Sequence, residues 1–304
     1  MKVLIVRYND QPAVNIVDNM TMFSRYRCDV RTRDRLDVSG YDVVFYYNIN
    51  DIFTTNVYDM LVKTQTHICV GAQSWRFTFE SEWIDKFPNL NVIGVCSPTG
   101  EILDAVLKRI PPVVSAVTPF SADRRFFTET DSIRTEGKLR VGYIGTFRED
   151  KRYLDIVKPA FDQLKGQVEF NIIGKASGKR VEHTKMVEEY NTMDCLVVGS
   201  KYESGPMPPL EAALCGRPTI TTKCGMMQDV FEMSGAIFIS GDYNALVNTI
   251  KMLMIDRDLC ISIGQDAKNR LMYEWDWSTL MKKQDDFFER VYNARETGYA
   301  PSVC

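Results

Sequence analysis

The chain has 304 residues, of which 45% are hydrophobic and 25% charged, and its formal net charge is -3. This composition is typical of a globular protein with a substantial core, the length predicts two domains, and the charge excludes a general attraction to nucleic acid or membrane. No apolar run approaches the ~20 residues that span a bilayer, and the apolar start is too short for a signal peptide. The eight scattered cysteines contain no C-x-x-C pair and are typical of reduced thiols, so we expect a cytoplasmic protein.

Strand-like and helix-like segments alternate along the first half of the chain. Strands are predicted at residues 2–8, 28–33, 41–48, 67–75, 91–97 and 113–117. Helices are predicted between them at residues 12–26, 54–63, 81–87 and 98–109. This alternation predicts a parallel, doubly wound sheet. The turn at residues 7–11 contains no glycine, so the dinucleotide fingerprint G-x-G-x-x-G is absent.

The second half repeats this pattern after a polar segment, residues 128–138, that we interpret as a linker. Strands are predicted at residues 138–145, 168–175, 195–200, 218–223 and 236–242. Helices are predicted from the turn at 146–151 to residue 164, over 183–194, from Pro209, and from Tyr243 onward. The second half is therefore also expected to form a parallel α/β domain.

The segment from Tyr202 to Pro218 joins a buried strand to a helix N-terminus. Free amides and the helix dipole favour an anion at such a point. Glu203 and Glu211 flank it with seven residues between them, and carboxylates accept hydrogen bonds from hydroxyls. An anion beside hydroxyl-binding carboxylates indicates a nucleotide sugar better than a bare phosphate.

Glu203-x7-Glu211, followed by Ala212 and Gly216-x-Pro218, resembles the signature of retaining family-4 glycosyltransferases, which have the GT-B fold. Pro119, Asp123 and Phe127 similarly match the family's interdomain segment, and the resemblance extends to about residue 294. It implies two Rossmann-like parallel-sheet domains facing a cleft. The implied divisions are an acceptor-side domain at 1–125, a nucleotide-sugar domain at 126–275, and a C-terminal helix at 276–304 that crosses back to the first domain.

The resemblance also implies roles for individual residues. Lys151 and Arg148 would hold the diphosphate, and Glu203 would face the sugar hydroxyls. Glu211 would bind the ribose. Thr146 stands where the family has an arginine, and Pro206 has no N–H to donate. The other residues expected to bind the donor are Gly145, Thr146, Gly174, Lys175, Ser204, Gly205, Met207, Pro208 and Leu210.

The expected reaction moves a sugar from a UDP- or GDP-sugar to a hydroxyl of a saccharide or lipid-linked saccharide. A second reading is a short, virus-encoded, phage-type enzyme acting on hydroxymethylated DNA bases, with five arginines between Arg25 and Arg35 contacting phosphate. An ordinary solvated strand explains the same arginines. A third reading is a non-catalytic GT-B protein that binds nucleotide or a partner. The candidate acceptor-side residues are Tyr8, Asn9, Gln73, Ser74 and Trp75.

Metal-binding signals are weak. Asp256-Arg257-Asp258 has the D-x-D form, but Asp256 precedes a helical run and is predicted to be its N-cap. His67 and His183 are the only histidines and lie far apart in the sequence. We therefore expect no cofactor and no essential metal, with the nucleoside diphosphate sugar as co-substrate.

Overall fold

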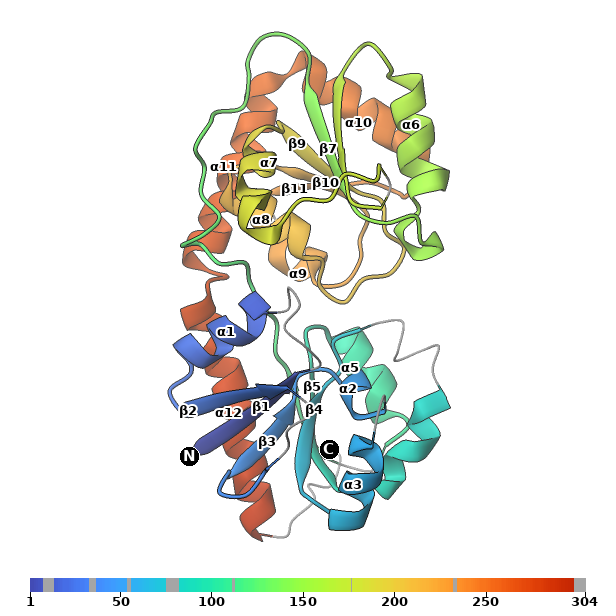
Figure 1. Ribbon diagram of the computed structural model, residues 1–304. Helices are drawn as coiled ribbons and strands as arrows, with labels where there is room; N and C mark the ends of the chain where they lie inside the picture. The colour runs from blue at the N-terminus through green and yellow to red at the C-terminus, as the bar shows by residue number, and fades with distance from the viewer. Residues whose placement is uncertain are drawn as a thin grey trace. The chain divides into compact units, whose positions relative to one another are not determined.

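The chain forms two compact units in the computed structural model (Figure 1). The structure describes residues 1–7, 14–32, 37–53, 56–74, 82–110, 113–175, 177–231 and 234–297. Unit 1 consists of Met1–Phe120 and Trp277–Cys304, and unit 2 of Ser121–Asp276. Among the helices of the described ranges, none is long and apolar enough to cross a membrane.

Unit 1 is built on a six-stranded sheet in the order β2-β1-β3-β4-β5-β6, and every neighbouring pair is parallel. Its strands are β1 (Lys2–Arg7), β2 (Arg27–Thr32), β3 (Val43–Tyr46), β4 (Ile68–Gly71), β5 (Val92–Ser97) and β6 (Val114–Val117). Its helices are α1 (Val14–Phe23), α2 (Asn50–Phe53), α3 (Val57–Thr64), the 3-10 helix η1 (Glu82–Asn89), α5 (Gly100–Leu107) and α12 (Trp277–Thr297). The helix predicted at 81–87 is the 3-10 helix η1, Glu82–Asn89, which contains Pro88, and Ser81 lies outside the described residues.

Helices cover both faces of this sheet, so its central strands are buried on both sides. Leu4 and Val6 of β1 belong to the core shared with α3 and α5. Phe45 of β3 instead meets Phe287 and Phe288 of α12, with ring centroids 6.5 and 5.3 Å away. A Cβ on Gly94 of β5 would lie only 2.5 Å from the Val291 side chain, so the close packing of α12 requires glycine there.

Unit 2 contains a five-stranded parallel sheet in the order β11-β10-β9-β7-β8. Its strands are β7 (Arg140–Ile144), β8 (Glu169–Ile173), β9 (Cys195–Val198), β10 (Thr219–Thr221) and β11 (Ala236–Phe238). Its α-helices are α6 (Lys158–Gln163), α7 (Met186–Asn191), α8 (Met207–Leu214), α9 (Met227–Phe231), α10 (Tyr243–Ile255) and α11 (Arg257–Tyr273). The prediction of two parallel α/β sheets is thus confirmed.

Two helix predictions in unit 2 need correction. The single helix expected up to residue 164 is divided into a 3-10 turn η2 (Glu149–Lys151), a π-helical turn η3 (Tyr153–Val157) and α6, because Arg152 adopts a left-handed φ of 50°. Helix α8 begins at Met207, two residues before the predicted Pro209, which moves Glu211 out of the first turn. A further 3-10 segment of unit 2, η4 (His183–Lys185), precedes α7.

Asp256 is the N-cap of α11, as predicted, and its carboxylate accepts a hydrogen bond of 2.8 Å from the Leu259 amide. No group of three or more histidine, cysteine or acidic side chains in the described ranges is arranged to hold a metal ion.

Candidate functional site

A cavity of about 280 Å³ lies in unit 2 at the carboxyl ends of the neighbouring strands β7 and β9. The carboxyl edge of a parallel sheet is the usual ligand site in open α/β domains. We call this 280 Å³ cavity the Lys151 cavity. Its lining residues are Tyr143, Ile144, Gly145, Thr146, Lys151, Val197, Val198, Ser200, Glu203, Pro206, Met207 and Pro208.

Lys151 and Glu203 form an ion pair within this cavity. The Lys151 ammonium contacts Oε1 of Glu203, and the Ser200 hydroxyl donates to the same oxygen at 2.8 Å. Their side chains are only 21% and 12% exposed, so the pair is shielded from most solvent screening. The structure therefore brings the predicted phosphate-binding cation and the predicted sugar-binding carboxylate together.

The backbone around Glu203 is fixed by a close approach of Gly225. The Met226 amide donates to the Ser204 carbonyl at 3.1 Å. A Cβ on Gly225 would lie 2.7 Å from the carbonyl oxygens of both Glu203 and Ser204, and its φ of 54° also favours glycine. Gly225 thus allows the turn after β10 to support the loop that carries Glu203.

The N-terminus of α8 offers fewer amides to an anion than the sequence pattern suggested. Pro206 is the N-cap, and two of the first three helical residues, Pro208 and Pro209, have no N–H. Met207 is the cavity-lining residue of this turn that retains one. Thr146 adds a side-chain donor, because its hydroxyl is buried and has no hydrogen-bond partner among the described residues.

Glu211 does not line the Lys151 cavity. Its carboxylate lies between His183, whose Nε2 is 2.9 Å from Oε1, and Tyr190, whose hydroxyl donates to Oε2 at 2.6 Å. The hydrogen bond to Glu211 raises the pKa of His183. Burial, followed by the charge of Glu211, raises the pKa of Tyr190 well above its usual value.

His183 was not singled out as a site residue from the sequence. Its ring stacks on Phe126 at a centroid distance of 6.3 Å and an interplanar angle of 9°, and meets the edge of Phe127 at 5.5 Å. It lies 28 residues before its carboxylate partner. A histidine in a polar segment carries no signal for such a contact.

Arg148 is placed outside the Lys151 cavity. Its guanidinium binds the Asp150 carboxylate through two hydrogen bonds of 2.9 and 2.5 Å, and its side chain is 47% exposed. Gly174 lies against Gly145, because a Cβ there would be 2.4 Å from the Gly145 carbonyl oxygen. Leu210 is fully buried, Lys175 is exposed, and Ser204 and Gly205 are half-buried.

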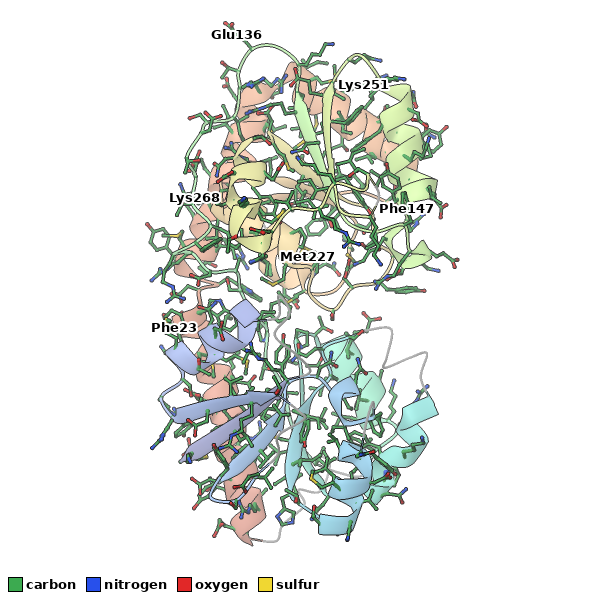
Figure 2. The ribbon with its side chains drawn as sticks, in the orientation of Figure 1. Phe23, Glu136, Phe147, Met227, Lys251 and Lys268 are labelled. Carbon is green, nitrogen blue, oxygen red and sulfur yellow. The ribbon has the colours of Figure 1, made fainter. Side chains whose placement is uncertain are left out.

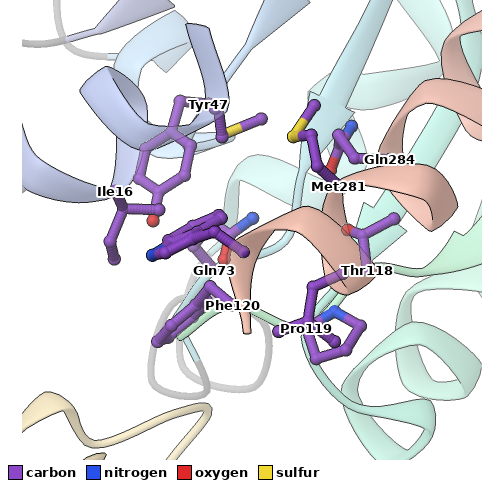
Figure 3. Close-up of a pocket in the computed structure, with 11 residues that line it drawn as sticks. Ile16, Tyr47, Gln73, Thr118, Pro119, Phe120, Met281 and Gln284 are labelled. Carbon is purple, nitrogen blue, oxygen red and sulfur yellow. The ribbon is translucent and has the colours of Figure 1, made fainter. Parts of the chain in front are cut away.

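Of the predicted acceptor-side residues, Tyr8, Asn9 and Trp75 lie outside the described residues. Gln73 and Ser74 follow the carboxyl end of β4 in unit 1. Gln73 lines a small cavity of about 10 Å³ (Figure 3). Its other lining residues are Ile16, Met20, Tyr47, Thr118, Pro119, Phe120, Trp277, Leu280, Met281 and Gln284, so α12 contributes one wall.

Residues 176–270, which include Glu203, Glu211 and α8, match the family described as Glycosyl transferases group 1. No curated protein sequence matches the chain.

Solved structures share the fold at low sequence identity. Sucrose-phosphate synthase from Thermosynechococcus elongatus aligns with a TM-score of 0.75 and 14% identity, over 97% of this chain and 100% of the synthase chain. HepE from Anabaena, in complex with UDP and glucose, aligns with a TM-score of 0.72 and 12% identity over 95% and 99% of the two chains. The lipopolysaccharide outer core galactosyltransferase WaaB aligns with a TM-score of 0.61 and 12% identity over 98% and 100%.

These neighbours identify the fold as GT-B. Residues 176–270 therefore match the group 1 glycosyltransferase family model within a GT-B fold, and both findings support a glycosyltransferase.

Proposed function

We propose that the protein is a retaining glycosyltransferase that moves a sugar from a nucleoside diphosphate sugar to an acceptor hydroxyl. The observation that carries this proposal is the Lys151–Glu203 pair inside one cavity at the carboxyl edge of the sheet. A cation suits the diphosphate, and a carboxylate suits the sugar hydroxyls.

A UDP-sugar is the favoured donor. HepE has been crystallised with UDP, with UDP and glucose, and with UDP-glucose, and its alignment covers 95% of the present chain. A GDP-sugar is the alternative donor that the sequence pattern allows. We propose a saccharide or a lipid-linked saccharide as the acceptor.

Lys151 would act on the leaving group. As the bond between the anomeric carbon and the phosphate oxygen breaks, negative charge grows on the diphosphate, and a cation already in place stabilises it. An entering diphosphate would replace Glu203 as the partner of Lys151 and release the Glu203 carboxylate for the sugar hydroxyls. In a retaining reaction of this kind, the leaving phosphate takes the acceptor proton, so no separate base is required.

Glu211 would bind the ribose from outside the Lys151 cavity. Each carboxylate oxygen has two acceptor sites, so an oxygen that already accepts from His183 or Tyr190 can still accept from a hydroxyl. The two protein contacts would fix the direction of the remaining acceptor sites.

Calorimetric titration of the whole protein with UDP, GDP and ADP tests this assignment. Glu211→Gln should weaken binding of the preferred nucleotide by about 1–3 kcal/mol, the cost of an impaired polar contact. Glu188→Gln is the matched control, because Glu188 is an exposed glutamate of α7 in the same unit. Equal affinities in all three proteins would contradict the ribose role.

Catalysis is tested by release of free nucleoside diphosphate with saccharide, lipid-linked and hydroxymethylated-DNA acceptors. Release that requires a saccharide acceptor supports the proposal. Tight nucleotide binding without release on any acceptor would favour the non-catalytic reading.

A further inference from the structure

A second cavity, of about 390 Å³, lies in unit 2 beyond the carboxyl ends of β9, β10 and β11. We call it the basic cavity. Its lining residues are Arg152, Ser200, Lys201, Thr222, Lys223, Phe238, Ile239, Ser240 and Gly241. Ser200 lines both this cavity and the Lys151 cavity, whereas Lys151 and Glu203 line only the latter.

The basic cavity has an excess of positive charge. Arg152, Lys201 and Lys223 line it, and no acidic residue among those the structure describes does. Within the part of the chain that the structure describes, none of these three cations forms an ion pair with a carboxylate. Asp242, which directly follows the lining residue Gly241, is the N-cap of α10, and its carboxylate accepts hydrogen bonds from the Ser240 hydroxyl and the Ala245 amide.

Arg152 reaches this cavity from an unfavourable backbone conformation. Its φ of 50° and ψ of 31° are left-handed, a region that a residue with a Cβ adopts at an energetic cost. Its Nη1 atom lies against the backbone of Gly241, where an added Cβ would be 2.9 Å away. The glycine therefore leaves room for a guanidinium that pairs with no carboxylate in the described ranges.

We propose that the basic cavity is a second anion site that binds a phosphate monoester group, separate from the site of the donor diphosphate. A guanidinium and two ammonium groups from different segments supply the charge and donors that a phosphate dianion requires. The volume accommodates a phosphate together with the small organic group that carries it. Inorganic phosphate is the other source of the same chemistry.

Phosphorus NMR and calorimetry on the whole protein test this site, with inorganic phosphate and glycerol 3-phosphate as probes at low ionic strength. Each probe is titrated with and without saturating UDP. We expect binding in both conditions, with glycerol 3-phosphate the tighter ligand, and a Kd raised at least about tenfold by Arg152→Gly. Glycine adopts the φ of residue 152 readily, so this variant removes the guanidinium without adding backbone strain.

Three further variants complete the design. Arg152→Lys should restore part of the affinity, and Lys223→Gln should lower it. Lys251→Gln is the control, because Lys251 is an exposed cation of α10 outside both cavities (Figure 2). Affinities unchanged in Arg152→Gly and Lys223→Gln, or lowered as much in Lys251→Gln, would show an adventitious ion only and overturn the proposal.

The two sites can be told apart in the same experiment. Competition between the phosphate probes and UDP, together with loss of probe binding in Lys151→Ala, would assign the anion to the Lys151 cavity and refute a second site. Failure of UDP to bind would contradict the proposed function alone, because the probe titrations without UDP still report on Arg152 and Lys223.

Discussion

Glu211 is held by two donors from the preceding segment, with His183 Nε2 2.9 Å from one carboxylate oxygen and the Tyr190 hydroxyl 2.6 Å from the other. Tyr190 is fully buried and Glu211 nearly so, whereas the His183 side chain is 28% exposed. A buried carboxylate requires such partners. The trio therefore links the stability of unit 2 to the protonation of a histidine.

The first prediction concerns pH. The pKa of His183 is raised in the folded protein, chiefly by its hydrogen bond to Glu211. A raised folded-state pKa contributes stability that is complete below the unfolded value of about 6.5 and is lost as the pH rises through the folded value. His183→Gln should therefore be most destabilising at pH 5.5 and least at pH 8.5, measured by urea unfolding. A difference independent of pH would contradict the contact.

Tyr190→Phe provides the comparison for that experiment. The phenol has a pKa far above this range, so it stays protonated throughout. Its removal leaves a buried carboxylate oxygen without a donor, which should cost about 1–3 kcal/mol with little change between pH 5.5 and 8.5. Using differences between variants also cancels the contribution of His67, whose pKa is lowered by burial.

A second prediction concerns Lys151. Lys151→Ala should reduce kcat by about 10²-fold or more while weakening ground-state binding of the donor less, because the diphosphate gains charge as the bond breaks. Lys165→Ala, at an exposed lysine of the same unit, should match the wild type. Arg148→Ala tests whether Arg148 leaves its partner Asp150 and helps to stabilise the diphosphate. If Arg148 does so, the loss of kcat in Arg148→Ala should approach the loss in Lys151→Ala. Equal losses of binding and turnover in Lys151→Ala would contradict its role.

Chelation is the third test. With Lys151 supplying positive charge to the leaving diphosphate, transferase activity should survive EDTA. Activity should be assayed after dialysis against the chelator and again after addition of manganese or magnesium. Complete loss of activity in EDTA that either metal restores would contradict metal independence and make Asp256 and Asp258 the candidate metal ligands.

The fourth prediction separates acceptor classes by salt. Arg25 pairs with Asp286 and Glu289 at 3.1 and 2.5 Å, and Arg31 donates to the Asp37 carbonyl at 2.9 Å. The two carboxylates offset the charge of Arg25, so we expect only a weak dependence of any DNA binding on salt. Each phosphate contact would otherwise add about -0.7 to -0.9 to the log-log slope.

The arginine variants give the corresponding contrast. Replacing Arg25, Arg27 and Arg31 together should leave sugar transfer to a saccharide nearly unchanged. Sugar transfer to hydroxymethylated DNA, with a steep salt slope that these replacements flatten, would instead support the DNA acceptor. Arg33 and Arg35, which complete the sequence cluster, lie outside the described residues.

A fifth prediction concerns α12. Phe288 is fully buried and its ring meets Phe45 of β3. Phe288→Ala should destabilise unit 1 by about 3–5 kcal/mol, measured by hydrogen exchange of the β3 and β5 amides. Ile255→Ala, which shortens a side chain that is 88% exposed, should be nearly silent. Unchanged exchange in Phe288→Ala would contradict this packing.

The strands could be predicted from the sequence because each one is marked by the hydrophobicity of its own few residues. Buried parallel strands appear as short apolar runs, as in CLVV of β9, and the carboxyl ends of such strands meet at one edge. That geometry, with the family resemblance, was enough to predict that Lys151 and Glu203 belong to one site. The exact start of α8 was missed because Pro208 and Pro209 are compatible with either start.

Other features of the site could not be read from the sequence. The partners of Glu211 come from a separate helix and a 3-10 turn, and neither His183 nor Tyr190 stands in a distinctive pattern. Left-handed backbone is expected at glycine, so an arginine at residue 152 gave no indication that the helix would break there. The pairing of Arg148 with Asp150 depends on side-chain rotamers that residue order does not determine.

The return of α12 to unit 1 has a consequence for how the chain folds during synthesis. Unit 2 is one continuous stretch, whereas the sheet of unit 1 precedes it in the chain and the partner helix α12 follows it. On the ribosome, unit 2 is complete while Phe45 and Gly94 still lack the side chains of Phe287 and Val291. The face of the unit 1 sheet that α12 covers therefore stays without this helix until α12 emerges, and such transiently exposed apolar surface is what chaperones protect.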